Sequence, residues 1–149
     1  MKILVDADAC PVKDIIVQQA ALRGIEVVMV CDTAHRIDDG YSRVLVVDKG
    51  ADMADIKIAN LVCPKDIVVT QDYGVASMAL GKGAFALSQN GLEYTAQNIE
   101  RLLFERFLGK KSRQAGIRTH AVKKRTRQDD QAFLQAFVRL LEREEKECV

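Results

Sequence analysis

The chain has 149 residues, of which 48% are hydrophobic and 29% are charged, and its formal net charge is +1. This length and composition suit one domain with a buried core. The four cysteines are far apart and show no C-x-x-C spacing, so they indicate neither a zinc module nor a disulfide framework. No apolar run approaches the roughly 18 residues of a membrane span, and no secretory leader pattern opens the sequence. We therefore expect a cytoplasmic protein with reduced thiols and no membrane partner.

Short runs rich in β-branched residues alternate with helical patterns along the first part of the chain. The runs predict strands at residues 2–6, 25–31, 43–48, 66–71 and 84–87. Helices are predicted between them at 11–24, 52–62 and 74–81, the first with Pro11 in its first turn and Gly24 at its end. Such near-continuous apolar strands are typical of a parallel sheet covered on both faces. The sequence therefore predicts an α/β fold with three layers, α/β/α, around a mainly parallel sheet.

Beyond these elements the pattern is helical. Four apolar residues share one face of a helix predicted to begin at Thr95, namely Ile99, Leu102, Leu103 and Phe107. A basic, polar segment follows at 109–127, and a final helix over 129–147 is predicted to begin with Thr126 and Asp129 as a capping pair. The apolar stripe of that helix, expected to pack on the rest of the fold, consists of Phe133, Phe137, Leu140 and Leu141. Residues 1–149 are thus predicted to form a single domain.

Six aspartates lie where predicted strands end or the following helices begin: Asp6, Asp8, Asp48, Asp52, Asp55 and Asp72. Because the carboxyl ends of parallel strands meet at one edge of a sheet, we expect these carboxylates to converge. Close like charges repel by on the order of a few kcal/mol per pair, so the cluster needs protonation, helix N-termini or a hard cation to compensate it. Oxygen ligands without His or Cys favour Mg²⁺ or Mn²⁺, which commonly act on phosphates. The pattern predicts a Mg²⁺ or Mn²⁺ site.

Each acid also has a structural interpretation. Asp8 and Asp52 could be helix N-caps, since Asp is a favoured cap, and Asp48 could be a turn residue that faces solvent. Lys13, one helical turn after the first two acids, could reach a phosphate or could be a solvated helix lysine. The functional interpretation rests on the joint pattern, in which acids occupy separate strand ends.

Four motifs together carry a resemblance to a known family: DADACPVK at 6–13, KGADMADIKIA at 49–59, TQDYGVASMAL at 70–80 and GLEYT at 91–95. In this combination, over nearly the whole chain, the sequence resembles the YaiI/YqxD family of bacterial proteins. That family is grouped by its fold with PIN-like and NYN-type nuclease domains, which cut RNA with clustered acids and Mg²⁺ or Mn²⁺. The resemblance therefore implies a PIN-like fold and a metal-dependent ribonuclease-like activity.

The resemblance also implies roles for individual residues. Asp6 corresponds to the first-strand acid of those nucleases, Asp52 to their middle acid and Asp72 to their late acid. Thr70 is the hydroxyl next to the late acid, while Asp8 and Asp55 belong to motifs of the family itself. Two departures are visible: PIN domains often carry a second acid at the place of Gly74, and their middle acid is commonly Glu.

Two other functions remain open. The D-x-D pair at 6–8 also resembles the opening of haloacid-dehalogenase-type phosphatases, in which the first Asp attacks phosphorus and the second acts as acid and base. The third possibility is a module that binds RNA or protein without catalytic activity.

Charge is unevenly distributed, with a net of −5 over residues 1–100 and +6 over residues 101–149. The segment 109–127 contains no acid, no aromatic residue and eight cations: Lys110, Lys111, Arg113, Arg118, Lys123, Lys124, Arg125 and Arg127. Such a segment can bind the phosphate backbone of RNA or DNA but offers no platform for base stacking. A solvated loop is the alternative interpretation.

Overall fold

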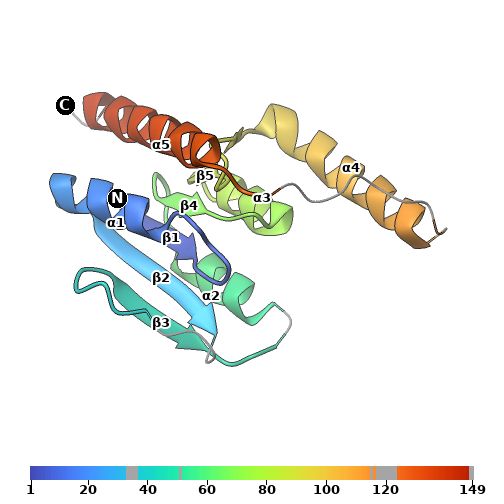
Figure 1. Cartoon of the computed structure of the whole chain (residues 1–149), viewed down its shortest axis with the longest axis horizontal. Coiled ribbons are helices and arrows are strands. Elements are labelled where there is room, and N and C mark those ends of the chain that lie inside the picture. The colour runs from blue at the N-terminus through green and yellow to red at the C-terminus, as the bar shows by residue number, and fades with distance from the viewer. Residues whose placement is uncertain (33–36, 51, 115, 117–123, 148–149) are drawn as a thin grey trace.

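The computed structural model describes residues 1–32, 37–50, 52–114, 116 and 124–147. Six strands form one sheet, in the order β3-β2-β1-β4-β5-β6. Their bounds are β1 Lys2–Asp6, β2 Glu26–Asp32, β3 Arg43–Val47, β4 Ile67–Val69, β5 Phe85–Leu87 and β6 Glu93–Tyr94. All neighbouring strands are parallel except β5 and β6. The predicted α/β fold with a mainly parallel sheet is confirmed (Figure 1).

Helices cover both faces of the sheet. On one face lie α1 (Lys13–Arg23) and α5 (Arg127–Glu147), and on the other lie α2 (Met53–Leu61), α3 (Tyr73–Gly81) and α4 (Ala96–Gln114). Successive residues of a strand point to opposite faces, so Ile3 and Val5 pack with α1 and α5 while Leu4 packs with the other three helices. Both layers of side chains are buried, which explains why the strands carry continuous apolar runs.

The apolar stripe of α5 packs as predicted. Phe133 and Phe137 are fully buried, and their rings stack with centroids 5.4 Å apart. The helix begins at Arg127, and the predicted capping pair forms: the Thr126 N–H donates to Asp129 at 2.9 Å, and the Asp129 N–H donates to the Thr126 hydroxyl at 3.3 Å. An ion pair of 3.4 Å between Arg23 and Glu145 also joins α5 to α1.

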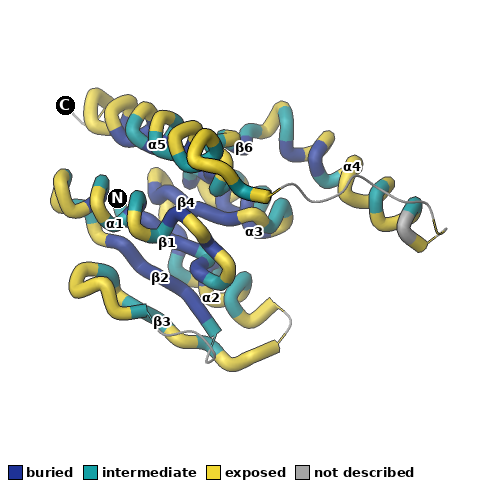
Figure 2. The backbone as a smooth tube through the Cα atoms, in the orientation of Figure 1, coloured by how far each residue is buried: buried dark blue, intermediate teal, exposed yellow. Residues whose placement is uncertain are grey.

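Several local predictions were wrong. Pro11 precedes α1 rather than lying in its first turn, because the helix begins at Lys13. The stretch around Gly91 contains a further strand, β6, in addition to the turn. The first residues of the basic segment are helical, since α4 continues to Gln114. Phe107 is 53% exposed although Ile99 is buried, because α4 extends beyond the sheet that its first turns cover (Figures 1 and 2).

Gly24 ends α1 in the left-handed conformation, as the sequence predicted. Within the described residues, no helix combines the length and the apolar character needed to cross a bilayer. Cys10, Cys31 and Cys63, the cysteines in that part of the chain, form no disulfide there.

Candidate functional site

The sheet has a topological switch point between β1 and β4. From β1 the chain moves to β2 and β3 on one side, and β4 and β5 lie on the other side. Loops that leave the carboxyl ends of two such strands diverge and leave a crevice between them, which is where open α/β sheets bind ligands. Asp6 is the last residue of β1, and Thr70 and Asp72 follow the end of β4. The register that pairs Val5 with Val69 brings these residues together.

Thr70 joins the two acids. Its hydroxyl donates a hydrogen bond to Oδ2 of Asp6 at 3.2 Å and accepts one from the Asp72 N–H at 3.0 Å. The Tyr94 hydroxyl donates to the Thr70 carbonyl at 3.3 Å, and Thr70 is only 3% exposed. Because the hydroxyl proton of Thr70 is directed at Asp6, the position of this carboxylate is fixed relative to β4.

Asp72 is the N-cap of α3. Its Oδ1 accepts hydrogen bonds from the N–H groups of Gly74 at 2.8 Å and Val75 at 3.1 Å. A Cβ atom at position 74 would lie 3.1 Å from this oxygen, so a side chain there would crowd the carboxylate. Glycine at position 74 therefore leaves room for the cap.

The N-terminus of α2 brings a second pair of acids near Asp72. Asp55 lies in the first turn of α2, and burial followed by the charges of Asp72 and Asp52 raises its pKa. A side-chain hydrogen bond that protonated Asp55 donates to Asp52 acts in the same direction. Asp52 occupies the N-cap position with φ +66°, yet its side chain makes no capping hydrogen bond. Its carboxylate is thus not used to cap the helix, contrary to the structural interpretation of this residue.

Asp6 experiences the combined field of the acids. Burial, together with the negative charges of Asp55, Asp8 and Asp72, raises the pKa of Asp6 to about 6 despite the opposing hydrogen bond from Thr70. Acids that are far apart in the sequence therefore act on one carboxyl group. This coupling involves three of the other five acids at which the sequence predicted a site, namely Asp8, Asp55 and Asp72.

Asp8 holds the loop after β1. Its carboxylate accepts the N–H of Asp32, at 3.1 Å to Oδ2 and 3.3 Å to Oδ1, which ties the loop to the end of β2. Asp8 precedes α1 by several residues, so it is not the N-cap of that helix. Lys13 folds back over the same loop and donates to the Ala7 carbonyl at 3.3 Å.

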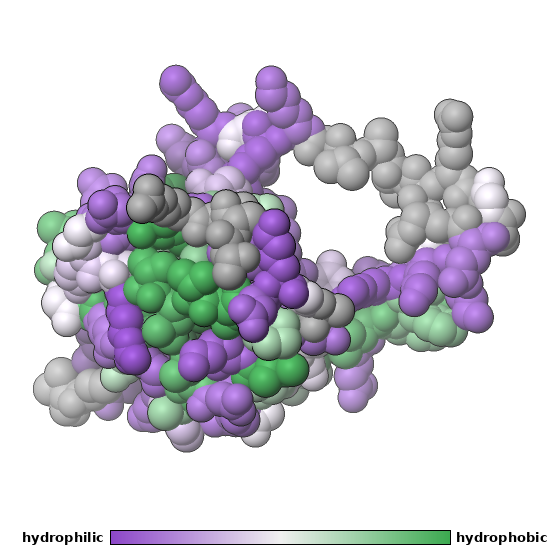
Figure 3. Space-filling model, turned by 90° about the horizontal axis from the view of Figure 1, so that it is seen from below, coloured by the Kyte–Doolittle hydropathy of each residue, from purple (hydrophilic) through white to green (hydrophobic). Residues whose placement is uncertain are grey.

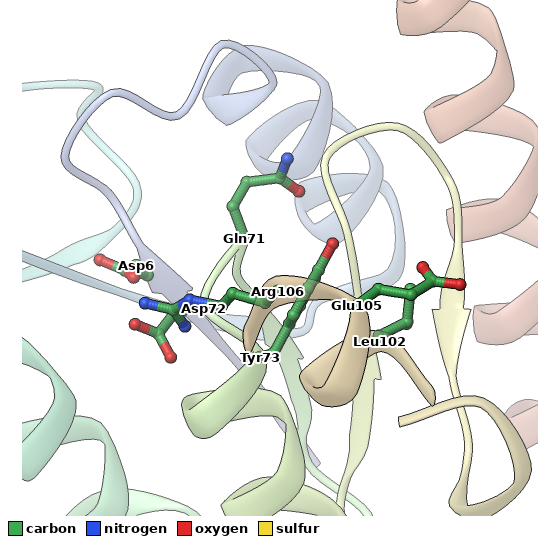
Figure 4. A pocket seen from close by; sticks show the side chains of 7 residues that line it. All are labelled: Asp6, Gln71, Asp72, Tyr73, Leu102, Glu105 and Arg106. Atoms are coloured by element: carbon green, nitrogen blue, oxygen red, sulfur yellow. The ribbon is translucent and has the colours of Figure 1, made fainter. Parts of the chain in front are cut away.

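The spacing of the acids does not predict a basic side chain at this site, but the structure places Arg106 there. Together with Asp6 and Asp72 it lines a cleft of about 630 Å³, and its side chain extends from α4 toward both carboxylates (Figure 4). The other lining residues are Gln71, Tyr73, Leu102 and Glu105. The sequence does contain a sign of this residue. Arg106 follows buried Leu102 by four positions and Ile99 by seven, so it is a charged residue on the apolar face of its helix.

Other predicted site residues lie elsewhere. Asp48 is exposed after β3, an edge strand separated from β1 by β2, and no interaction within the described residues links it to the other acids. Arg125 holds the loop before α5 by donating to Asp130, Asn90 and the Gln89 carbonyl at 2.7, 2.7 and 2.8 Å. These bonds give Arg125 a structural role.

The remaining basic residues divide between two places. Lys110 and Lys111 lie on α4, which also contains Arg113, whereas Lys124 precedes α5 and Arg127 is its first residue. Arg118 and Lys123 fall outside the described residues. A hollow of about 510 Å³ next to Lys124 and Arg125 shares Gln71 with the acid cleft. Lys124 and Arg125 therefore line a hollow next to the acid cleft rather than the cleft itself.

The donor chemistry of the site suits Mg²⁺ or Mn²⁺, since it consists of carboxylates and the hydroxyl of Thr70. Among the described residues, no three acidic, His or Cys side chains lie close enough together to hold one ion. Mg²⁺ in particular usually binds through one or two carboxylates and retains several water molecules. Asp6 and Asp72, which face the same cleft, fit that requirement.

The chain is similar to a known protein family over most of its length. Residues 4–143 match the family described as "Uncharacterized BCR, YaiI/YqxD family". The chain belongs to the YaiI/YqxD family. Among its relatives is a UPF0178 protein of Ruminiclostridium cellulolyticum, 59% identical over 138 residues, which cover 93% of this chain and 90% of the relative. A UPF0178 protein of Clostridium acetobutylicum is 48% identical over 96% of this chain and 98% of its own.

One solved structure is also similar to this chain. A crystal structure of a mutant of Rae1 (YacP) from Bacillus subtilis has a TM-score of 0.43 and 23% sequence identity. The likeness covers 78% of this chain and 84% of that one.

Proposed function

We propose that the cleft between β1 and β4 binds Mg²⁺ or Mn²⁺ and hydrolyses phosphodiester bonds of RNA. One observation carries the proposal: Asp6, with a pKa of about 6, experiences the charges of three other carboxylates at the switch point of the sheet. Clustered acids whose charges oppose one another are costly to maintain in a fold, and they are typical of sites that bind a cation or exchange protons. The PIN-like character of the domain is part of the same proposal.

The residues would divide the work as follows. Asp6 and Asp72 hold the metal ion, with Asp52 and Asp55 at the edge of the same charged region; when bound, the ion polarises the phosphate and helps to activate water. Arg106, which lines the same cleft, would donate hydrogen bonds to the phosphate oxygens. Thr70 fixes the orientation of Asp6.

Hydrolysis balances without a further reactant. A water oxygen forms a bond to phosphorus, the bond between phosphorus and the leaving ribose oxygen breaks, and a proton from the water passes through a carboxylate to that oxygen. A carboxyl group with a raised pKa is suited to this transfer near neutral pH.

Two substitutions test the proposal. Asp6→Asn and Asp72→Asn remove a negative charge, and the Asn at position 72 keeps an oxygen for the cap of α3. Each should slow cleavage of a labelled single-stranded RNA by about a hundredfold or more. Circular dichroism should show that both variants keep the fold. Asp48→Asn, which changes an exposed acid outside the cleft, is the matched control and should cleave like the original protein.

A binding measurement separates an enzyme from a silent module. Mn²⁺ should raise the melting temperature of the protein, and Asp6→Asn should reduce this effect, because an ion that binds only the folded state stabilises it. No cleavage and no metal-dependent shift would reject the proposal in favour of a binding module. Release of inorganic phosphate from small monoesters, with no cleavage of RNA, would instead identify a phosphatase.

A further inference from the structure

The outer part of α4 carries exposed apolar residues that the core does not use. Phe104 is 59% exposed, Phe107 53% and Leu108 47%. These positions are spaced by three and four residues, as is Lys111, so all four lie on one side of the helix. Figure 3 shows hydrophobic side chains along one side of the projecting helix, directly beside hydrophilic ones. Two exposed rings on an extended helix are unusual because their burial would be favourable.

The charge around these rings is positive. From Arg106 to Gln114 the helix contains four cations and no acid. The ammonium group of Lys111 lies 5.5 Å from the centroid of the Phe107 ring, a cation–π contact. Phe107, Lys110, Lys111 and Gln114 line a hollow of about 170 Å³. Aromatic faces beside long cationic side chains are the two components of sites that bind single-stranded nucleic acids.

The same helix borders the acid cleft. Leu102 and Arg106 line the cleft with Asp6 and Asp72, and Lys110, four residues after Arg106, lies on the same side of α4. Lys110 also lines the hollow beside Phe107, so a nucleic acid strand that leaves the cleft along α4 would reach this hollow next. The basic segment 109–127 itself contains no aromatic residue for stacking, but α4 places Phe104 and Phe107 immediately before it.

We propose that α4 is a platform for single-stranded RNA, on which Phe104 and Phe107 stack with bases and Lys110 and Lys111 contact backbone phosphates. The proposal rests on the proposed function for its choice of RNA as the ligand. Positive charge favours a polyanion over an uncharged or basic protein partner. The stacking of bases on aromatic rings tolerates any sequence, so the platform predicts preference for single strands without strong sequence preference.

The test measures binding rather than cleavage. A fluorescent oligouridine of about twelve nucleotides, within the length that one single-strand site spans, is titrated with the full chain in EDTA and followed by fluorescence anisotropy. Replacing both rings by Leu keeps apolar bulk and helix propensity but removes the aromatic faces. This double variant should bind about fivefold more weakly or worse. Leu22→Ala, which removes a 74% exposed side chain on α1, is the matched control and should not change the affinity.

Two further measurements define the interaction. Lys110→Gln combined with Lys111→Gln should reduce the slope of log affinity against log salt by about 1.4, since each phosphate contact on a single strand contributes about 0.7. A duplex of the same length should lose little affinity in the ring variant, because its bases are already stacked. These results are independent of Asp6 and Asp72, so the platform can be confirmed even if no cleavage is found.

Unchanged binding of oligouridine by the ring variant would overturn the proposal. The proposal also fails if sedimentation shows that the original chain self-associates, that the variant with both rings replaced by Ala is monomeric, and that RNA binding is unaltered. In that case the apolar side of α4 is a contact between two copies of the chain.

Discussion

Replacement of Asp6 by Asn should stabilise the metal-free protein at neutral pH. Burial, with the nearby acids, raises the pKa of Asp6 from 3.8 to about 6. The difference corresponds to about 3 kcal/mol of stability that is lost when the carboxyl group is charged. Because this side chain is only partly buried, solvent screening reduces the expected cost to about 1–2 kcal/mol. The Asn side chain carries no charge and keeps an oxygen that can accept the Thr70 hydroxyl.

The sign of the change in stability with pH follows from proton binding. A carboxyl group with a raised pKa binds its proton more tightly in the folded state, so stability falls as the pH rises from 3.8 to about 6. Above this window the full cost is present, and below it the cost disappears. The advantage of the Asn variant should therefore be large at neutral pH and vanish in acid.

Urea-induced unfolding in EDTA measures this advantage as the difference in unfolding free energy between variant and original at about pH 4 and about pH 7.5. Asp48→Asn serves as the control, because Asp48 is exposed and lies outside the cluster. An equal difference at both pH values, or a variant that is less stable at neutral pH, would refute the electrostatic account of the cleft.

Two further predictions concern the fold, and both can be measured by the same unfolding assay. Asp66→Ala should lower the free energy of unfolding by about 3 kcal/mol. Asp66 is 3% exposed and accepts hydrogen bonds from the Lys2 ammonium at 2.6 Å, the Lys2 N–H at 3.0 Å and the Cys63 N–H at 2.7 Å. A loss below about 1 kcal/mol would contradict the importance assigned to these bonds. Gly91→Ala should lower the free energy of unfolding by about 2 kcal/mol or more, since φ is +90° and a Cβ atom would lie 2.6 Å from the Ala132 carbonyl oxygen of α5. Gly40→Ala is the control: φ is +72° but the space around it is open, so the loss should be smaller.

Local patterns predict the elements more reliably than their ends. The strand at 2–6 matches its prediction residue for residue: its buried apolar run, Ile3 to Val5, is flanked by Lys2 and Asp6, which are the ends of the strand. The strand expected at 66–71 is shorter, Ile67–Val69. The backbones of Asp66 and Thr70, which flank the strand, still bond to β5 through the Phe85 N–H and the Leu87 carbonyl. Their side chains bind Lys2 and Asp6, partners that are distant in sequence and that a local pattern cannot predict.

The helical pattern of α4 is misleading at its outer end. Phe107 continues the periodicity of Ile99 and Leu102, and periodicity alone predicts that it is buried. The helix extends beyond the edge of the sheet, so the same face that is buried at Ile99 is exposed to solvent at Phe107. Periodicity reports which side of a helix a residue lies on, but it contains no information about what that side meets.

The sequence by itself determined that acids stand at the carboxyl ends of strands, because hydrophobic runs and the residues that interrupt them are local properties. Only the tertiary structure decided which of those acids share a site. The strand order places β1 beside β4 and sends β3 to the edge, which brings Asp6 together with Asp72 and leaves Asp48 apart. It also directs Arg106 into the cleft, a contact that depends on the packing of α4 and could not be read from the spacing of the aspartates.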